Sequence, residues 1–194
     1  LDGIVLSPAV AGRPVRIRAG GRIDAAGSTE DPRFEADIRA SLGAVAVAGL
    51  SVSSSDIRLV ASGTRSSADI SLLDARLAGL AFEAAEEKTI AFDKAALIAK
   101  GTIDLARESG ILTSLEARLP DLAPLRFSGR FGSGRGASSE LRLDAQGLDV
   151  PALRAKAAPF LPAGFGDWDI GGALDLSLSV RRPTASPGDW HFSG

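Results

Sequence analysis

Hydrophobic and polar residues alternate along much of this chain with a period of two residues. In segment 34–42 every second residue is apolar, from Phe34 through Ile38 to Leu42, and the residues between them are polar or charged. The same alternation returns in segments 141–145 and 174–180. Successive side chains of a β-strand point to opposite faces, so this pattern predicts strands with one apolar and one polar face.

Similar apolar-rich runs predict further strands throughout the chain. They cover residues 15–23, 45–52, 57–61, 68–72, 75–84, 89–99, 102–106, 112–119, 125–131 and 190–192. Turn signals such as Ser62-Gly63 and Ser109-Gly110 separate them. Helical patterns do not alternate with the strands, which disfavours a doubly wound α/β fold. The sequence therefore predicts an antiparallel, all-β chain.

One segment departs from the strand pattern. Asp149 suits a helix N-cap, Pro151 suits a first helical turn, and Pro159 prevents the helix from continuing. These signals predict a short amphipathic helix at residues 151–158, within a helical insertion at residues 149–162. An unprotected sheet edge invites further strand pairing, so this insertion is expected to plug one end of the sheet.

Composition removes several classes of site. The 194 residues carry 22 basic and 24 acidic side chains, so the chain lacks the excess of positive charge that binds a nucleic-acid backbone. The chain has no Cys and a single histidine, His191, so disulfides, thiolate metal sites and histidine clusters are excluded. We therefore expect no metal, no cofactor and no nucleic-acid partner.

Three motifs with possible chemistry have simpler interpretations. The Gly-rich segment 128–139 is followed by a strand pattern and holds no Lys, which favours a hairpin turn over a phosphate loop. Asp167, Asp169 and Asp175 lack the regular spacing and closing Glu of a calcium loop, which favours solvated strand ends. His191 has no Ser or Asp context that marks a catalytic relay. No catalytic residue is predicted, and we expect a protein that is not an enzyme.

The apolar face of the predicted strands is the remaining feature. Either the sheet closes on itself and this face is core, or the sheet curls into a trough and part of the face meets an apolar ligand. The alternation within single strands does not distinguish the two. The residues expected to face this groove or core are Phe34, Ile38, Leu42, Leu141, Leu143, Leu174, Leu176 and Leu178.

The C-terminal part of the chain carries a family resemblance. Its parts are Leu148-Asp-Val-Pro-Ala-Leu with the Pro-broken helix, the segment Gly-Gly-Ala-Leu-Asp-Leu-Ser-Leu-Ser-Val at 171–180, and the closing Trp190-His-Phe-Ser-Gly194. Together with the Gly-bounded amphipathic strands before them, they resemble the AsmA-like superfamily of Gram-negative envelope proteins, which includes TamB, YhdP and YdbH. The resemblance is general over most of the chain and more definite over 148–194.

The resemblance implies a long, twisted, U-shaped β-sheet, a β-taco-like fold whose concave side is an apolar groove. It implies a non-enzymatic section of a periplasmic bridge that conducts phospholipid between the inner and outer membranes or supports outer-membrane assembly. Phospholipid acyl chains and other envelope proteins are the implied partners. The chain starts at Leu1 and contains no Met. We therefore expect residues 1–194 to be one β-rich segment of a longer chain that carries the inner-membrane anchor.

Two other hypotheses remain open at this point. The first is a section of a secreted β-solenoid or adhesin-like structural domain with a closed core, although the strand spacing is less constant than a solenoid repeat. The second is a carbohydrate-active β-sandwich enzyme. That enzyme needs a cleft with two carboxylates, and aromatic side chains that stack on sugars, while the chain has two Trp and no Tyr.

Overall fold

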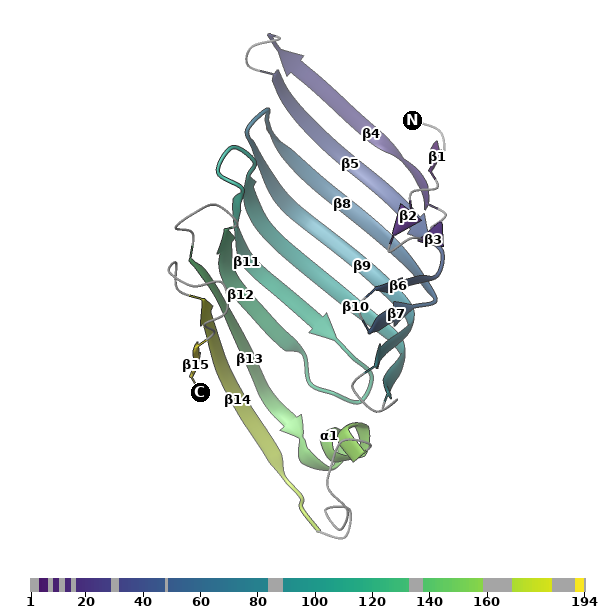
Figure 1. Ribbon diagram of the computed structural model, residues 1–194, viewed down its shortest axis with the longest axis vertical. Helices are drawn as coiled ribbons and strands as arrows, with labels where there is room; N and C mark the ends of the chain where they lie inside the picture. Colours follow the sequence, from purple (N-terminus) through teal and green to yellow (C-terminus); the bar gives the residue numbers. More distant parts are fainter. Residues whose placement is uncertain are drawn as a thin grey trace.

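The computed structural model describes residues 4–6, 9–10, 13–14, 17–28, 32–47, 49–83, 89–132, 138–158, 169–182 and 191–193. Almost all of them belong to one antiparallel sheet of 13 strands (Figure 1). The strands of this sheet are β1 Ile4–Leu6, β4 Ile17–Gly27, β5 Pro32–Leu42, β6 Val45–Val47, β7 Leu50–Val52, β8 Ser54–Thr64, β9 Ser67–Glu83, β10 Thr89–Asp104, β11 Ser109–Arg118, β12 Leu125–Gly132, β13 Ser139–Asp149, β14 Ala173–Arg182 and β15 His191–Ser193. Two short strands, β2 (Ala9–Val10) and β3 (Arg13–Pro14), pair separately. The predicted all-β, antiparallel class is confirmed.

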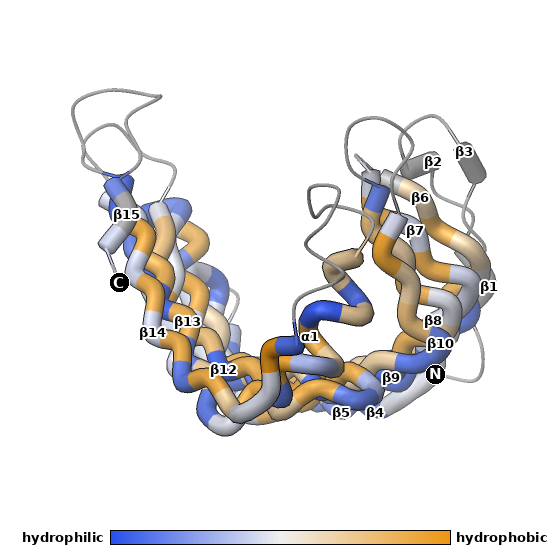
Figure 2. Tube along the Cα trace, turned by 90° about the horizontal axis from the view of Figure 1, so that it is seen from below, coloured by the Kyte–Doolittle hydropathy of each residue, from blue (hydrophilic) through white to orange (hydrophobic). Residues whose placement is uncertain are grey.

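Strand order follows chain order across the sheet. The path runs β1-β4-β5-β8-β9-β10-β11-β12-β13-β14-β15, with the β6–β7 hairpin attached to β9. The strands at the two ends of this path do not pair with each other, so the sheet stays open and does not close into a barrel. Seen along its length, the sheet is curled into a U (Figure 2). The curled, open architecture is therefore present.

Strand β9 is continuous where the sequence predicts two strands, 68–72 and 75–84. It pairs Ile70 with Ala61 and Leu72 with Val60, which leaves Ser71 as an extra residue in a β-bulge. A bulge shifts the alternation by one residue without ending the strand. The prediction of two strands was wrong because this phase change resembles the end of a strand.

Strand β10 is also continuous, although the sequence predicts separate strands at 89–99 and 102–106. Gly101 lies inside the strand, opposite Leu112 of β11. A Cβ atom at this position would collide with the carbonyl oxygen of Ile111, so the glycine allows the two backbones to approach closely. The glycine marks this close approach and does not end the strand, so the prediction of two separate strands was wrong.

Segment 45–52 is a hairpin and not the single strand predicted. β6 and β7 pair antiparallel, and Gly49 lies between them with a φ of 80°. This left-handed backbone conformation favours glycine. A Cβ atom at Gly49 would also lie 2.8 Å from the carbonyl oxygen of Glu83. The turn is not evident in the sequence because Gly49 is the one residue of this apolar run that favours a turn.

The predicted helix is confirmed as α1, Val150–Ala157. Asp149 is the N-cap, and its Oδ1 accepts a hydrogen bond from the backbone N–H of Ala152 at 2.7 Å. Pro151 stands in the first turn, where its missing N–H costs nothing. The helix lies inside the trough of the U (Figure 2). Residues 159–162 of the predicted insertion lie outside the described residues.

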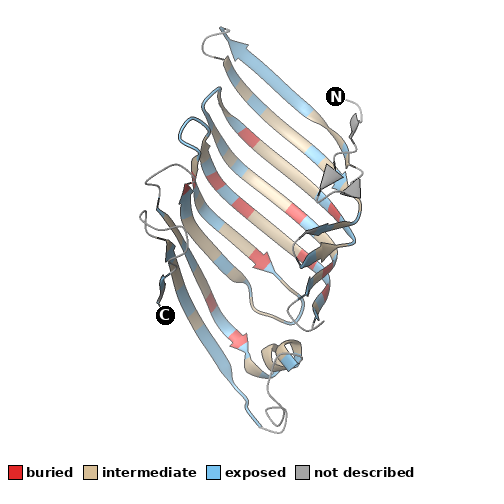
Figure 3. Ribbon diagram, in the orientation of Figure 1, coloured by how far each residue is buried: buried red, intermediate tan, exposed pale blue. Residues whose placement is uncertain are grey.

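Few of the described residues are deeply buried. The buried hydrophobic residues are Ala61, Ala75, Leu80, Phe92, Ala95, Ala99, Ala117, Ala145 and Leu148, most of them alanines. They lie on the strands between β8 and β13, while β4 and β14 are mostly exposed (Figure 3). The accessible surface is 12964 Å², whereas a compact protein of 19.9 kDa exposes about 8,700 Å². No second large sheet covers this one among the described residues, so the architecture is not a β-sandwich.

Candidate apolar groove

The strand register places apolar residues from distant parts of the chain in line across the sheet. Directly paired residues project from the same face, so a chain of such pairs forms a row of side chains at right angles to the strands. One row crosses from β4 to β14 without a polar residue. We define this first row as Ala19, Ala40, Ile57, Ala75, Leu97, Ala117, Leu125, Ala145 and Leu176.

Two further rows run beside the first on the same face. The second row is Gly21, Ile38, Leu59, Leu73, Ala99, Leu115, Phe127, Leu143 and Leu178. The third row is Ile23, Ala36, Ala61, Ile70, Gly101, Leu112, Gly129, Leu141 and Val180. Neither row contains a polar or charged side chain. The three rows together form a continuous apolar surface from β4 to β14.

This apolar surface lines the inside of the U. Helix α1 lies in the trough, and Lys156 Nζ of the helix is 5.3 Å from the centre of the Phe92 ring on β10. Phe92 packs with Ala95 and Leu80 in one buried cluster. Ala95 lies two residues before Leu97, a member of the first row, and therefore on the same face of β10.

Large side chains of the groove are partly exposed to solvent on the C-terminal strands β13 and β14. Leu141 is 41% exposed, Leu174 42% and Leu178 39%, although all three lie on the apolar face. A hollow of about 630 Å³ lies here, and its apolar wall includes Leu112, Phe131 and Val180 beside Leu141. Side chains of a closed core do not keep this much contact with solvent. The groove is therefore accessible from outside in this region.

The sequence-predicted groove residues all lie on the apolar face. Leu141, Leu143, Leu174, Leu176 and Leu178 come together on the adjacent strands β13 and β14. Phe34, Ile38 and Leu42 line the same face of β5, with β8 to β12 between the two groups. Their assignment as lipid-contacting residues stays a prediction.

Sequence reasoning missed the residues that connect these two groups. The missing members of the second row are Leu59, Leu73, Ala99, Leu115 and Phe127. The strands that hold these residues were predicted, so the alternation within each strand was the signal that could have placed them on the apolar face. The bulges on β9 and β11 change the phase of that alternation, and only the pairing register shows which residues line up.

The opposite face of the sheet carries mostly polar and charged side chains, several of which form ion pairs. Glu140 on β13 accepts hydrogen bonds from Arg130 on β12 at 3.0 Å and from Arg181 on β14 at 3.2 Å. The Arg181 and Arg130 guanidinium groups hold the pKa of Glu140 below its ordinary value. Arg142, with help from the Ser177 hydroxyl, lowers the pKa of Asp144 in the same way. This face is built for contact with water.

These ion pairs predict a loss of stability in acid. The pKa values of Glu140 and Asp144 are lower in the folded chain than their ordinary values of 4.5 and 3.8. The folded state thus binds fewer protons, and the stability that the pairs provide is present above those ordinary values and lost as pH falls through the folded-state values. We expect a lower melting temperature at about pH 3 than at about pH 7, measured by circular dichroism.

A double variant isolates the contribution of these two carboxylates. Glu140→Gln with Asp144→Asn is expected to melt lower than the wild type at neutral pH and to lose less stability on acidification. An acid-induced shift as large as that of the wild type would contradict the assignment to these two groups.

The candidate chemistry considered from sequence finds no support in the described residues. The described residues contain no group of three or more His, Asp or Glu side chains that could hold a metal ion. Asp175 accepts a hydrogen bond from the Gly147 N–H at 2.8 Å, and His191 is exposed on β15. Asp167 lies outside the described residues. Residues 128–132 of the Gly-rich segment belong to β12, and Ser139 begins its antiparallel neighbour β13, so a strand follows this segment where a phosphate loop requires a helix.

Comparison with known proteins gives no match among protein-family models, curated proteins or solved structures. Among the described residues, no helix is long and apolar enough to cross a membrane.

Proposed function

We propose that this chain is a non-enzymatic section of a periplasmic, lipid-conducting protein of the Gram-negative envelope. The single observation that supports this proposal most is the set of three apolar rows that cross the sheet without interruption on the inside of an open U. An acyl chain in such a groove stays in contact with apolar surface as it moves from strand to strand. In this proposal the parent protein is anchored in the inner membrane and works with other envelope proteins.

An open groove suits an amphipathic cargo better than a closed cavity does. Acyl chains can lie along the rows while the polar headgroup stays at the open side of the U, in water. A headgroup that had to enter the groove would lose its hydration at a cost of several kcal/mol. Transfer along the groove requires no bond to be made or broken, which agrees with a site built of Ala, Leu, Ile, Val and Phe side chains.

The exposed groove side chains disfavour a closed structural section. In a β-solenoid or adhesin-like domain the inner face is solid core, and Leu141, Leu174 and Leu178 would be buried. Contiguous apolar patches larger than a few hundred Å² are rare on monomeric proteins and mark surfaces that bind something apolar. The proposal accounts for the exposed surface by placing lipid there.

Native mass spectrometry of the purified chain, followed by solvent extraction and lipid identification, tests the proposal directly. We expect adducts of phospholipid mass that disappear on extraction. A lipid-free mass, unchanged after incubation with phospholipid in detergent, would refute lipid binding by this section.

A further inference from the structure

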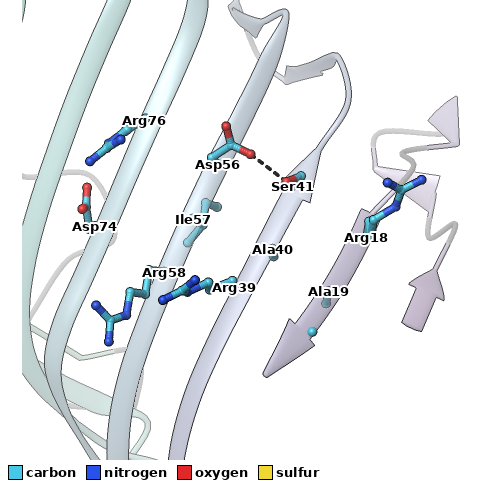
Figure 4. A pocket seen from close by; sticks show the side chains of 11 residues that line it. Arg18, Ala19, Arg39, Ala40, Ser41, Asp56, Ile57, Arg58, Asp74 and Arg76 are labelled. Atoms are coloured by element: carbon cyan, nitrogen blue, oxygen red, sulfur yellow. Dashed lines mark hydrogen bonds between the residues drawn. The ribbon is translucent and has the colours of Figure 1, made fainter. Parts of the chain in front are cut away.

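Four arginines line a hollow on the polar face of the sheet; Figure 4 shows Arg39 and Arg58 on neighbouring strands, with Arg18 standing apart from them on β4. The hollow has a volume of about 640 Å³ and is lined by Arg18 of β4, Arg39 of β5, Arg58 of β8 and Arg76 of β9. Ile38 and Ala40, the chain neighbours of Arg39, belong to the apolar rows, so Arg39 projects from the other side of the sheet. The strand register places the other three arginines on this same polar side. The site is thus separated from the groove by the backbone of the sheet.

The register brings like charges together at this hollow. Arg39 is paired directly with Arg58, and Gly20 lies on the other side of Arg39. Like charges on directly opposite residues of neighbouring strands are destabilising. Gly20 has no side chain to occupy the place beside Arg39. The arrangement leaves both space and positive charge on the surface.

Nearby acids neutralise only part of this charge. Asp37 engages Arg58, accepting from Nε at 3.1 Å and from Nη2 at 2.8 Å. Asp56 is the cross-strand neighbour of Arg76, but its Oδ1 accepts from the Ser41 hydroxyl at 2.6 Å.

Three of the four guanidinium groups therefore have no described carboxylate within hydrogen-bond distance, although Asp37, whose pKa is lowered chiefly by Arg58, also attracts Arg39. Within the part of the chain that the structure describes, Arg18, Arg39 and Arg76 form no hydrogen bond or ion pair.

Elsewhere on the polar face, several arginines are paired with carboxylates. Arg118, Arg130, Arg142 and Arg181 each form an ion pair with a carboxylate. At the hollow, four arginines face the lining carboxylates of Asp56 and Asp74 and the Asp37 carboxylate that is bound to Arg58, which leaves a net charge of +1 in a chain whose net charge is -2. The positive charge is a local feature and does not follow from composition.

We propose that this hollow, the arginine site, binds a phosphate-bearing anion. The planar guanidinium group donates paired hydrogen bonds that match phosphate oxygens, and several of them around one hollow suit a multiply charged phosphoryl group. The phosphate can belong to a small molecule or to a lipid headgroup in a membrane surface. A lipid whose chains lie in the groove cannot supply it, because the sheet stands between. The proposal is therefore independent of the proposed groove function.

Binding of inorganic pyrophosphate, measured by isothermal titration calorimetry at low salt, tests the arginine site. The double variant Arg39→Gln with Arg76→Gln is expected to bind about ten-fold more weakly or worse, since charge-assisted hydrogen bonds are lost. The matched control is Arg65→Gln with Arg107→Gln, which removes the same charge from two exposed residues away from the hollow. It should retain wild-type affinity. Equal losses in both double variants, or no binding by the wild type to either this probe or the vesicles below, would overturn the site.

Vesicle sedimentation distinguishes the two sources of phosphate. Binding to vesicles that contain phosphatidylglycerol, but not to pure phosphatidylcholine, identifies a lipid headgroup if Arg39→Gln with Arg76→Gln removes it. Pyrophosphate binding without vesicle binding identifies a small phosphorylated molecule. Melting temperatures complete the test, because removal of Arg39 relieves a like-charge pair and the variant should fold as well as the wild type.

Discussion

Replacing Leu178 with aspartate should abolish phospholipid binding by this chain while leaving the chain folded. Leu178 is a member of the second row and is 39% exposed at the accessible end of the groove. A carboxylate in contact with acyl chains would lose its water without gaining a partner, which costs several kcal/mol. We expect the amount of co-purified phospholipid to fall at least about ten-fold, because a loss of about 1.4 kcal/mol already gives that factor.

The folding cost of this substitution should be modest. The side chain already contacts water, so the charge stays hydrated when no lipid is bound. We expect a decrease of about 1 kcal/mol in the free energy of unfolding, the usual scale of strand substitutions at partly exposed positions. Urea unfolding followed by circular dichroism measures it.

Ser179→Asp is the matched control for Leu178→Asp. Ser179 is the next residue of β14 and is paired with Arg142 on the polar face. It introduces the same charge into the same strand on the side away from the groove, and lipid binding should stay at the wild-type level. Lipid binding that survives Leu178→Asp in a folded protein would exclude this part of the groove from lipid contact. Unfolding of Leu178→Asp alone would show that the face is a closed core.

Shortening Leu148 to alanine should destabilise the chain more than any comparable change in the described groove. Leu148 is 2% exposed, the largest fully buried side chain among the described residues, and it precedes the helix N-cap Asp149. Removal of a buried leucine side chain costs about 2–5 kcal/mol through lost apolar burial and the cavity left behind. We expect a loss of this size because the sheet has few other buried side chains.

Leu174→Ala provides the control for this second prediction. Leu174 is the direct cross-strand partner of Leu148, but it is 42% exposed. The same chemical change should therefore cost about 1 kcal/mol or less. The free energies of unfolding of both variants, from urea titration, give the comparison. Equal losses would mean that Leu148 and Leu174 are buried to the same extent in solution, contrary to the structure.

The family resemblance predicted features that the geometry contains. The resemblance implies a curled open sheet with an apolar inner face, and both are present. The association with lipid transport and with the periplasm remains a proposal, since it comes from the resemblance. The two experiments on lipid binding test it.

The sequence alone determined the local elements of this protein. Alternation over 34–42, 141–145 and 174–180 places strands and their apolar faces, because side-chain direction along a strand depends only on its period of two. Asp149 and Pro151 fix the start of α1 for an equally local reason, since caps satisfy backbone groups within one turn.

Only the tertiary structure decided which residues act together. Whether the sheet closes depends on twist and on pairing between residues far apart in sequence, and neither is encoded in one strand. The bulge at Ser71 and the close approach at Gly101 set the register, so they decide that Ile38 and Leu178 share a row across the sheet. Arg39 and Arg76 likewise meet only through strand pairing. Register is a long-range property, and therefore both the groove and the arginine site exist only in the folded sheet.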